Sequence, residues 1–300
     1  MNFLYCFDSK FNLQALNSIM SIIKNNKNKE IKIFVIHDNP NSFKKLVNEY
    51  LNEYKEIFEI FEFKFDYLNF PKLYKSHVSK ATYFRLFFQE YIPKEVNFLT
   101  YVDSDIICIS DFYSKLDEKI NEIKKEKFLL GAVTESSGGS NKERLELSND
   151  NYFNAGVMIL NMNEWNKKIT IKNIINRMNT LGDKILWWDQ DILNSLVDGN
   201  YLAIEEKFNK QVGNIKNIPD KDDIFIHYSG KGKPWAVSFF RENINNVYQK
   251  NFRNTNIAFY HLETSKLIEN LIFLKNLIIG NYKKYDNKKV LKSFIKIKKI

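Results

Sequence analysis

Two aspartates, Asp103 and Asp105, are separated by one serine and follow a short apolar run, 98–102, that reads FLTYV. The β-branched and aromatic content of this run predicts a buried strand. Alternate residues of an extended backbone project to the same side, so the two carboxylates would repel each other and resist burial. A divalent cation shared with a diphosphate removes both problems. The spacing therefore predicts a metal and diphosphate site, with two solvated loop acids as the alternative.

A histidine at the end of a later apolar run is a candidate third ligand. His227 follows the apolar positions 224–226, and the glycine-bearing turn YSGKGKPW comes directly after it. Backbone N–H groups of such a turn can bind an anion, and Lys231 or Lys233 would add a positive charge beside phosphate oxygens. One imidazole, two carboxylates and two phosphate oxygens form a set that suits Mn²⁺ better than Mg²⁺. A purely structural histidine is the alternative.

Three more polar residues lie at the ends of predicted elements or within them. Arg85 belongs to a helix expected over 79–91 and would be either an arm toward a phosphate or nucleoside, or a partly exposed ion pair. Asn154 opens a strand expected over 153–161, beside small residues that let a ligand approach the backbone. Asp189 stands near the N-cap of a following helix, and capping alone is its alternative role.

The elements that must position these residues alternate between strands and helices. Strands are expected over 2–7, 31–36 and 57–65, with helices over 13–23 and 42–54 between them. This order predicts an α/β protein with a parallel sheet, whose ligands bind beyond the carboxyl ends of the strands. Asp8 stands at such an end, as do the two aspartates. No G-x-G-x-x-G follows the first strand, which disfavours a dinucleotide-binding site.

The second half of the chain continues the pattern. A strand is expected over 128–133, a mobile glycine-bearing loop over 136–150, one helix over 164–180 and a last strand over 224–227. Cys6 and Cys108 lie in apolar runs and are expected to be buried thiols in a reducing cytosol. The first residues do not resemble a signal peptide, and no run of about 18 apolar residues predicts a membrane span.

Positive charge is concentrated at the end of the chain. The net charge is +9, and residues 241–300 contain 13 Lys and Arg against 4 Asp and Glu. Residues 1–240 are therefore close to neutral, which argues against nucleic-acid binding by this part of the chain. The basic tail favours contact with an anionic surface. The expected division is therefore a catalytic domain over 1–240 and a helical tail over 241–300. Residues 283–300 are expected to form a basic amphipathic helix on a membrane surface, with a solvated helical cap as the alternative.

Four blocks of the chain, taken together, resemble the retaining glycosyltransferases of family 8. They are CFDSKF, KATYFRL leading into YVDSDI, FNAGVMILN, and WWDQDILN followed by HYSGKGKPW, all within residues 1–240. The chain looks most like bacterial lipopolysaccharide and lipooligosaccharide galactosyl- and glucosyltransferases. This resemblance implies a GT-A fold, a Rossmann-like mixed, mostly parallel sheet flanked by helices. It also implies a UDP-sugar donor, Mn²⁺ or alternatively Mg²⁺, a lipid-linked or free saccharide acceptor, and a bacterial cytoplasmic enzyme on the inner face of the cytoplasmic membrane.

The resemblance also implies a role for each matching residue. It makes Asp103, Asp105 and His227 the metal ligands, and Gly230 and Lys233 the diphosphate contacts. Asp8 would hold the uracil, and the rest of the donor would be contacted by Arg85, Asp103, Ser104 and Asn154. Asp189 would contact the donor-sugar hydroxyls, and Gln190 would lie on the reactive face of the anomeric carbon. Two departures stand out. Ser9, Lys10 and Phe11 replace the family's usual Asp-Asn-Tyr, so the family's asparagine contact with the nucleotide is not carried over. Glu135 stands where the family usually has an aspartate, and the longer side chain of the glutamate could change the choice of donor sugar.

The expected reaction has two rivals. Because Gln190 is a poor nucleophile, retention is expected by a same-face path, in which the leaving phosphate guides the incoming hydroxyl and no covalent intermediate forms. One rival is a degenerate relative that binds a nucleotide sugar or glycan without turnover, against which the intact Asp103, Asp105, His227 and Lys233 argue. The other is a glycogenin-like self-glucosylating enzyme, which would need an acceptor among the sixteen tyrosines.

Overall fold

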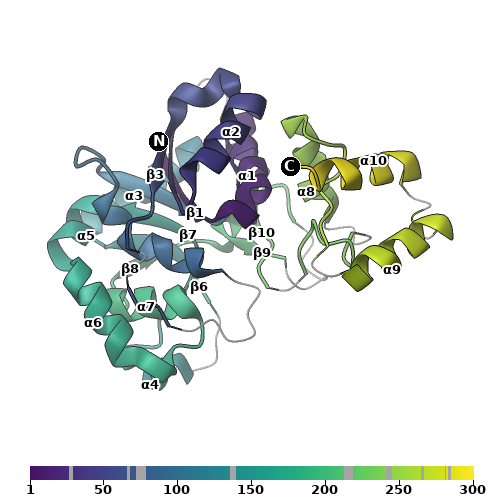
Figure 1. Ribbon diagram of the computed structural model, residues 1–300. Helices are drawn as coiled ribbons and strands as arrows, with labels where there is room; N and C mark the ends of the chain where they lie inside the picture. The colour runs from purple at the N-terminus through teal and green to yellow at the C-terminus, as the bar shows by residue number, and fades with distance from the viewer. Residues whose placement is uncertain are drawn as a thin grey trace.

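Strands and helices alternate along the chain much as the sequence predicts (Figure 1). The computed structural model describes residues 1–26, 30–65, 68–71, 79–135, 140–212, 219–230, 232–240, 245–264, 267–280, 282 and 285–300. The strands are β1 (Asn2–Phe7), β2 (Lys32–His37), β3 (Phe58–Glu62), β4 (Phe98–Val102), β5 (Ile106–Cys108), β6 (Leu130–Thr134), β7 (Phe153–Asn161), β8 (Tyr201–Ala203), β9 (Lys210–Gln211) and β10 (Phe225–His227). The α-helices are α1 (Asn12–Asn25), α2 (Pro40–Tyr50), α3 (Tyr113–Glu126), α4 (Ser140–Leu145), α5 (Met162–Lys168), α6 (Ile171–Leu181), α7 (Trp188–Val197), α8 (Asn245–Phe252), α9 (Leu267–Ile278) and α10 (Asn287–Ile297). Shorter 3₁₀ segments are Ser9–Phe11, Asn52–Ile57, Gly182–Lys184, Glu206–Phe208 and Arg253–Thr255, and the helix expected over 79–91 is a 3₁₀ helix, η3 (Lys80–Glu90).

Seven of these strands form one mixed sheet in the order β3-β2-β1-β4-β7-β6-β8. Neighbouring strands are parallel except at β7, which runs antiparallel to β4 and to β6. The prediction of a mixed, mostly parallel sheet flanked by helices is confirmed. The carboxyl ends of β1 and β4 therefore lie side by side, and the two aspartates emerge at this edge.

Both faces of the sheet are buried, which explains why its strands read as unbroken apolar runs. On β1, Leu4 belongs to one apolar core and Tyr5 to the other. The first core also holds Phe84 of η3, and the second holds Leu16 of α1. Since successive strand residues point to opposite faces, η3 and α1 cover opposite sides of the sheet.

A second, three-stranded sheet brings the end of the body back to the two aspartates. Its order is β5-β10-β9, and β10 runs antiparallel to β5, with His227 opposite Ile106. Because Ile106 directly follows Asp105, this register places the histidine beside the carboxylates. The short β5 is thus the element that joins two motifs more than a hundred residues apart.

Three expectations about helices and loops were wrong in detail. The single helix expected over 164–180 is two helices, because Thr170 caps α6: its hydroxyl accepts a hydrogen bond from Asn173 N–H, and its own N–H donates to the Asn173 side chain. The loop expected over 136–150 contains α4, and its residues 136–139 lie outside the described part of the chain. The helix expected over 42–54 begins at Pro40 and ends at Tyr50.

The tail differs most from expectation. The apolar residues Val290, Phe294 and Ile297 of α10 are buried against the rest of the chain, so this helix does not offer an apolar face to a membrane. Before it, α8 packs against α1, and the Asn251 side chain donates to the Asn17 carbonyl at 2.8 Å. The proposed division at residue 240 stays a prediction. Among the described residues, no helix combines the length and apolar character that crossing a bilayer requires.

Candidate functional site

A cavity of about 420 Å³ opens at the carboxyl edge of the large sheet. A volume of this size is typical of small-molecule sites. Of the residues predicted for the site, it is lined by Arg85, Asp103, Ser104, Asp105, Asn154, Asp189, Gln190, His227, Gly230 and Lys233. Asp8 does not line it, and its carboxylate accepts a hydrogen bond from Lys10 N–H at 3.0 Å. The role of Asp8 at the uracil stays a prediction, and Lys231 lies outside the described residues.

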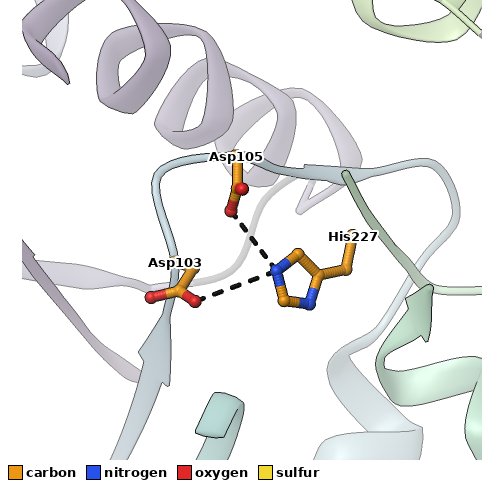
Figure 2. A group of neighbouring side chains, drawn as sticks. All are labelled: Asp103, Asp105 and His227. Atoms are coloured by element: carbon orange, nitrogen blue, oxygen red, sulfur yellow. Dashed lines mark ion pairs between the residues drawn. The ribbon is translucent and has the colours of Figure 1, made fainter. Parts of the chain in front are cut away.

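Two carboxylates and one imidazole meet in the wall of this cavity (Figure 2). His227 Nε2 lies 3.4 Å from Asp105 Oδ1 and 3.8 Å from Asp103 Oδ2. One ligand atom from each residue can be chosen so that all three lie within 4.8 Å of one another. Oxygen and imidazole donors at this spacing fit one divalent transition-metal ion. The structure therefore brings together the three residues that the sequence assigns to the metal.

The remaining oxygens of the two aspartates are held by cationic and hydroxyl groups. Asp103 Oδ1 accepts hydrogen bonds from the Arg85 guanidinium at 3.0 Å and the Tyr101 hydroxyl at 2.5 Å. Asp105 Oδ2 accepts from Lys233 Nζ at 2.6 Å. Burial alone would raise the pKa of Asp105, but Lys233 and His227 outweigh it and hold that pKa well below its usual value. Asp105 is therefore ionised at neutral pH, as a metal ligand must be.

A chain of amide hydrogen bonds fixes the histidine tautomer. The N–H of Gly156 can only donate, so Asn154 Oδ1, 2.9 Å away, is an acceptor. The same oxygen lies 2.8 Å from the Asn209 amide nitrogen, which leaves Asn209 Oδ1 facing His227 Nδ1 at 2.9 Å. Nδ1 therefore carries a proton, and Nε2 is the ring nitrogen that faces the carboxylates. Asn209 is a supporting residue that the sequence analysis missed.

Gly156 has a packing role that differs from the expected one. A Cβ atom built on it would lie 2.5 Å from His227 Cε1 and 2.7 Å from Nδ1. Any side chain there would displace the imidazole. Gly156 of the FNAGVMILN strand therefore makes room for the imidazole of His227.

Arg85 is buried and connects two acidic residues of the cavity. Its Nε pairs with Asp189, its Nη1 pairs with Asp103, and Nη1 also donates to the Ala155 carbonyl at 2.8 Å. Burial alone would lower the pKa of Arg85, but Asp103 and Asp189 outweigh it and raise that pKa further. The partly exposed ion pair considered from the sequence is wrong in its exposure. The guanidinium is a fixed bridge with one edge on the cavity.

Asp189 and Asp191 have different roles from simple caps. The N-cap of α7 is Trp187, and the buried Asp189 carboxylate instead accepts from the Thr82 hydroxyl and pairs with Arg85. Burial raises the pKa of Asp189, and Arg85 opposes that shift. Asp191 accepts from the N–H groups of Leu186 and Trp187 at 2.7 and 2.8 Å. It is also paired with Arg144 of α4, a contact that the sequence analysis did not find.

The Gln190 amide is held in one orientation. Its Oε1 accepts from Ala155 N–H at 3.0 Å, and its Nε2 donates to the Tyr152 hydroxyl at 3.1 Å and to Glu135 Oε2 at 3.4 Å. The other oxygen of Glu135 accepts from Asn154 Nδ2 at 2.6 Å. Glu135 thus orients two of the predicted donor contacts and itself lines the cavity.

An exposed tryptophan stands at the mouth of the cavity. Trp187 is 54% exposed and lines the cavity beside Gln190. The next residue, Trp188, has a φ of 47°, a left-handed conformation that is unfavourable for a bulky side chain. The hydrogen bonds from Leu186 and Trp187 to the buried Asp191 hold this turn. A large aromatic side chain is therefore kept in solvent by a rigid support.

Comparisons with known proteins find similar glycosyltransferases. The model of glycosyl transferase family 8 matches residues 2–239. A lipopolysaccharide 1,2-glucosyltransferase of Escherichia coli is 28% identical over an alignment of 265 residues, gaps included, that covers 80% of this chain and 76% of that relative. A lipopolysaccharide 1,3-galactosyltransferase of Salmonella typhimurium is 27% identical over an alignment of 168 residues, gaps included, that covers 52% of this chain and 49% of that relative.

Solved structures share the architecture. The galactosyltransferase LgtC, crystallised in complex with donor and acceptor sugar analogues, superposes with a TM-score of 0.72. It is 21% identical to this chain, and the alignment covers 89% of this chain and 98% of LgtC. The predicted GT-A fold is confirmed.

Proposed function

Because the chain belongs to glycosyl transferase family 8, we propose that it is a metal-dependent, retaining hexosyltransferase that moves galactose or glucose from a UDP-sugar to a saccharide. The observation that carries the proposal is the group of Asp103, Asp105 and His227 in the cavity wall, with Lys233 beside it. A degenerate relative that only binds a nucleotide sugar or glycan would not need to keep all four of these side chains together.

The proposed cofactor is Mn²⁺, with Mg²⁺ as the alternative ion. Asp103, Asp105 and His227 would hold it, and the ion would supply positive charge to the departing diphosphate. Lys233 adds a second positive charge from the loop after β10, and the positive φ of Gly230, 79°, gives that loop a turn that favours glycine. The charge that develops on UDP would therefore meet fixed cationic groups.

The residues at the sugar end support retention by a same-face path. Asp189 is engaged by Thr82 and Arg85, and Asp191 by Arg144 and two backbone amides, so neither carboxylate is free to attack. Gln190 is a neutral amide with a fixed orientation. Asp189 and Arg85 would bind donor-sugar hydroxyls, and Gln190 would face the anomeric carbon. A sugar trapped covalently on Asp189, seen as added mass on the intact protein, would contradict this path.

A nucleotide panel tests the function. Thermal shifts are measured with UDP-galactose, UDP-glucose, UDP-N-acetylglucosamine and GDP-mannose, each with Mn²⁺ or EDTA. A ligand at about 100 times its Kd adds about 2.7 kcal/mol to the free energy of unfolding, which is a readily measured shift. A Mn²⁺-dependent shift with one UDP-hexose, followed by release of UDP, is the expected result. No shift with any of them would contradict the proposal.

The names of the relatives point to a saccharide of lipopolysaccharide or lipooligosaccharide as the acceptor. We propose that Trp187 contacts this acceptor, because sugar rings present apolar C–H faces and large exposed aromatic residues commonly mark binding sites. Its place next to Gln190 would bring the acceptor hydroxyl to the reactive face of the donor.

Replacing Trp187 by Ala is expected to raise the KM for the acceptor by about 5- to 30-fold, which corresponds to the loss of one or two kcal/mol of stacking. Slow hydrolysis of the donor without acceptor should keep its rate, since Trp187 is not among the residues that would hold the diphosphate. Trp187→Phe, which retains an aromatic face, should recover most of the acceptor affinity. Steady-state kinetics with both variants checks this, and an unchanged acceptor KM in Trp187→Ala would disprove the role.

A membrane surface is the second proposed partner, and the proposed contact is α9 rather than α10. Leu267, Ile268, Leu271, Ile272, Leu274 and Ile278 of α9 are between 39% and 83% exposed, while Phe273 anchors the helix by packing against Phe294. Figure 1 shows α9 and α10 together at one side of the molecule. Residues 267–300 contain nine lysines and two acidic residues, so an apolar helix within a cationic segment fits an anionic lipid surface. The proposed location is the inner face of the bacterial cytoplasmic membrane.

The double variant Leu271→Glu/Ile272→Glu is expected to weaken binding to vesicles with anionic lipid at least about tenfold. Each fully buried Leu or Ile contributes about 1.5–3 kcal/mol, and 1.4 kcal/mol is a factor of ten. Asn176→Glu/Asn179→Glu on the exposed face of α6 makes the same change in charge and should leave binding nearly intact. Co-sedimentation measures both. Equal binding of the two variants would contradict a membrane role for α9, and an α9-dependent dimer in sedimentation would assign the face to a second copy.

A further inference from the structure

The loop that carries Gly230 and Lys233 is hydrogen-bonded to a segment of the chain that lies outside the family match. That match ends at residue 239, whereas residues 245–263, here called the support segment, contain α8 and the chain after it. On one side of Lys233, the N–H of Tyr248 donates to the Tyr228 hydroxyl at 3.2 Å. On the other side, the N–H of Glu263 donates to the Trp235 carbonyl at 2.8 Å. The loop is thus bonded to the support segment before and after its lysine.

One buried side chain makes the contact nearest to the lysine. Gln249 Nε2 donates to the Pro234 carbonyl and to the His261 carbonyl, both at 2.8 Å, and its Oε1 accepts from His261 N–H at 2.8 Å. Pro234 has no N–H of its own and directly follows Lys233. The amide of Gln249 therefore fixes the peptide between Pro234 and Trp235, one residue after the lysine, and joins it to the stretch around His261.

The aromatic ring that follows is held by the same segment. Trp235 is buried, with its ring centroid 5.4 Å from Tyr248 and 6.0 Å from His261. The imidazole of His261 is held on both sides, because Nδ1 lies 2.7 Å from the Tyr248 hydroxyl and Nε2 lies 2.7 Å from Glu263 Oε1. The support segment therefore contacts the loop at the Pro234 carbonyl and at the Trp235 ring.

Lys233 connects this loop to the cavity. Its Nζ donates to Asp105 at 2.6 Å and to the Tyr228 carbonyl at 2.8 Å, so these two hydrogen bonds depend on where the loop lies. We propose that Gln249 is a positioning residue of the donor site, which holds the loop so that Lys233 meets the diphosphate. The inference rests on the proposed function, and it makes the segment after residue 240 part of the active enzyme.

The test measures the affinity for UDP in the presence of Mn²⁺ by calorimetry, with the Tm of each free protein beside it. Gln249→Met removes the three hydrogen bonds with little change in shape and is expected to weaken UDP binding about tenfold, as expected when the charged contact of Lys233 with the diphosphate is weakened. The matched control is Asn251→Leu on the same helix. Its buried amide donates to Asn17 of α1 at 2.8 and 2.7 Å and does not touch the loop.

Both variants should lower the Tm, because each leaves buried carbonyl groups without donors, but only Gln249→Met should lower UDP affinity. In a Lys233→Met background, Gln249→Met should have little further effect on UDP binding, because it acts through the lysine. If Gln249→Met precipitates, Gln249→Glu, which turns an oxygen toward the Pro234 carbonyl, is expected to show the same loss. Equal UDP affinity in Gln249→Met and Asn251→Leu, or an unchanged loss in the Lys233→Met background, would overturn the inference alone. No UDP binding by the unaltered protein would overturn it together with the proposed function.

Discussion

Asp105→Asn is expected to lower hexose transfer by more than about 100-fold. Even groups one contact removed from a metal commonly cost 10–100-fold when they are replaced, and Asp105 would bind the ion directly. Asp105 is a cleaner test than Asp103, because Asp103 also holds Arg85 and Tyr101. Asparagine has nearly the shape of aspartate, and Lys233 keeps its bond to the Tyr228 carbonyl, so the fold should persist.

The measurement is the initial rate of UDP release at increasing Mn²⁺, with the Tm of the metal-free protein as a check on folding. The unaltered enzyme should lose activity in EDTA and regain it with excess Mn²⁺, whereas Asp105→Asn should not be rescued at the same concentration. Asp117→Asn, at an exposed position of α3, is the control for loss of one carboxylate. Transfer by Asp105→Asn at the normal rate would remove the metal from the proposed mechanism.

The sequence predicted the sheet because both of its faces are buried. A strand covered on two sides must be apolar throughout, and β1, β2 and β4 are short enough to stand out between polar turns. The cluster of Asp103, Asp105 and His227 could be predicted for a related reason. Asp103 and Asp105 lie at the end of such a strand, and His227 at the end of another, so each motif could be recognised by its own neighbours.

The supporting contacts could not be predicted, because they depend on pairings between distant parts of the chain. Asn209 reaches His227 only because β9 lies beside β10, and Arg144 reaches Asp191 only because α4 packs near α7. Neither residue belongs to a pattern in its own segment. The tail shows the same limit: α10 has an amphipathic sequence, but the pattern does not say whether the apolar face meets a membrane or Phe273 of α9.

Arg85→Met is expected to cause the largest loss of stability of any single substitution in the site. The change removes a buried cation from between Asp103 and Asp189 and leaves the Ala155 carbonyl without its donor. Breaking one partner of a buried ion pair typically costs about 3–5 kcal/mol, because the other charge stays buried without compensation. Arg85→Lys should recover little, since one ammonium group cannot reach two carboxylates and a carbonyl in the geometry of the guanidinium.

Urea denaturation measures the free energy of unfolding. Adding Asp189→Asn to Arg85→Met should restore part of the stability, because the second change removes the uncompensated buried charge. Lys32→Met, which removes a half-exposed ion pair with Glu59, should change stability little, because solvent already screens that pair. Transfer activity should remain low in the double variant, since Arg85 and Asp189 both line the donor cavity. A stable and active Arg85→Met protein would show that the bridge is dispensable, and recovered stability without activity would separate the role of Arg85 in folding from its role at the donor.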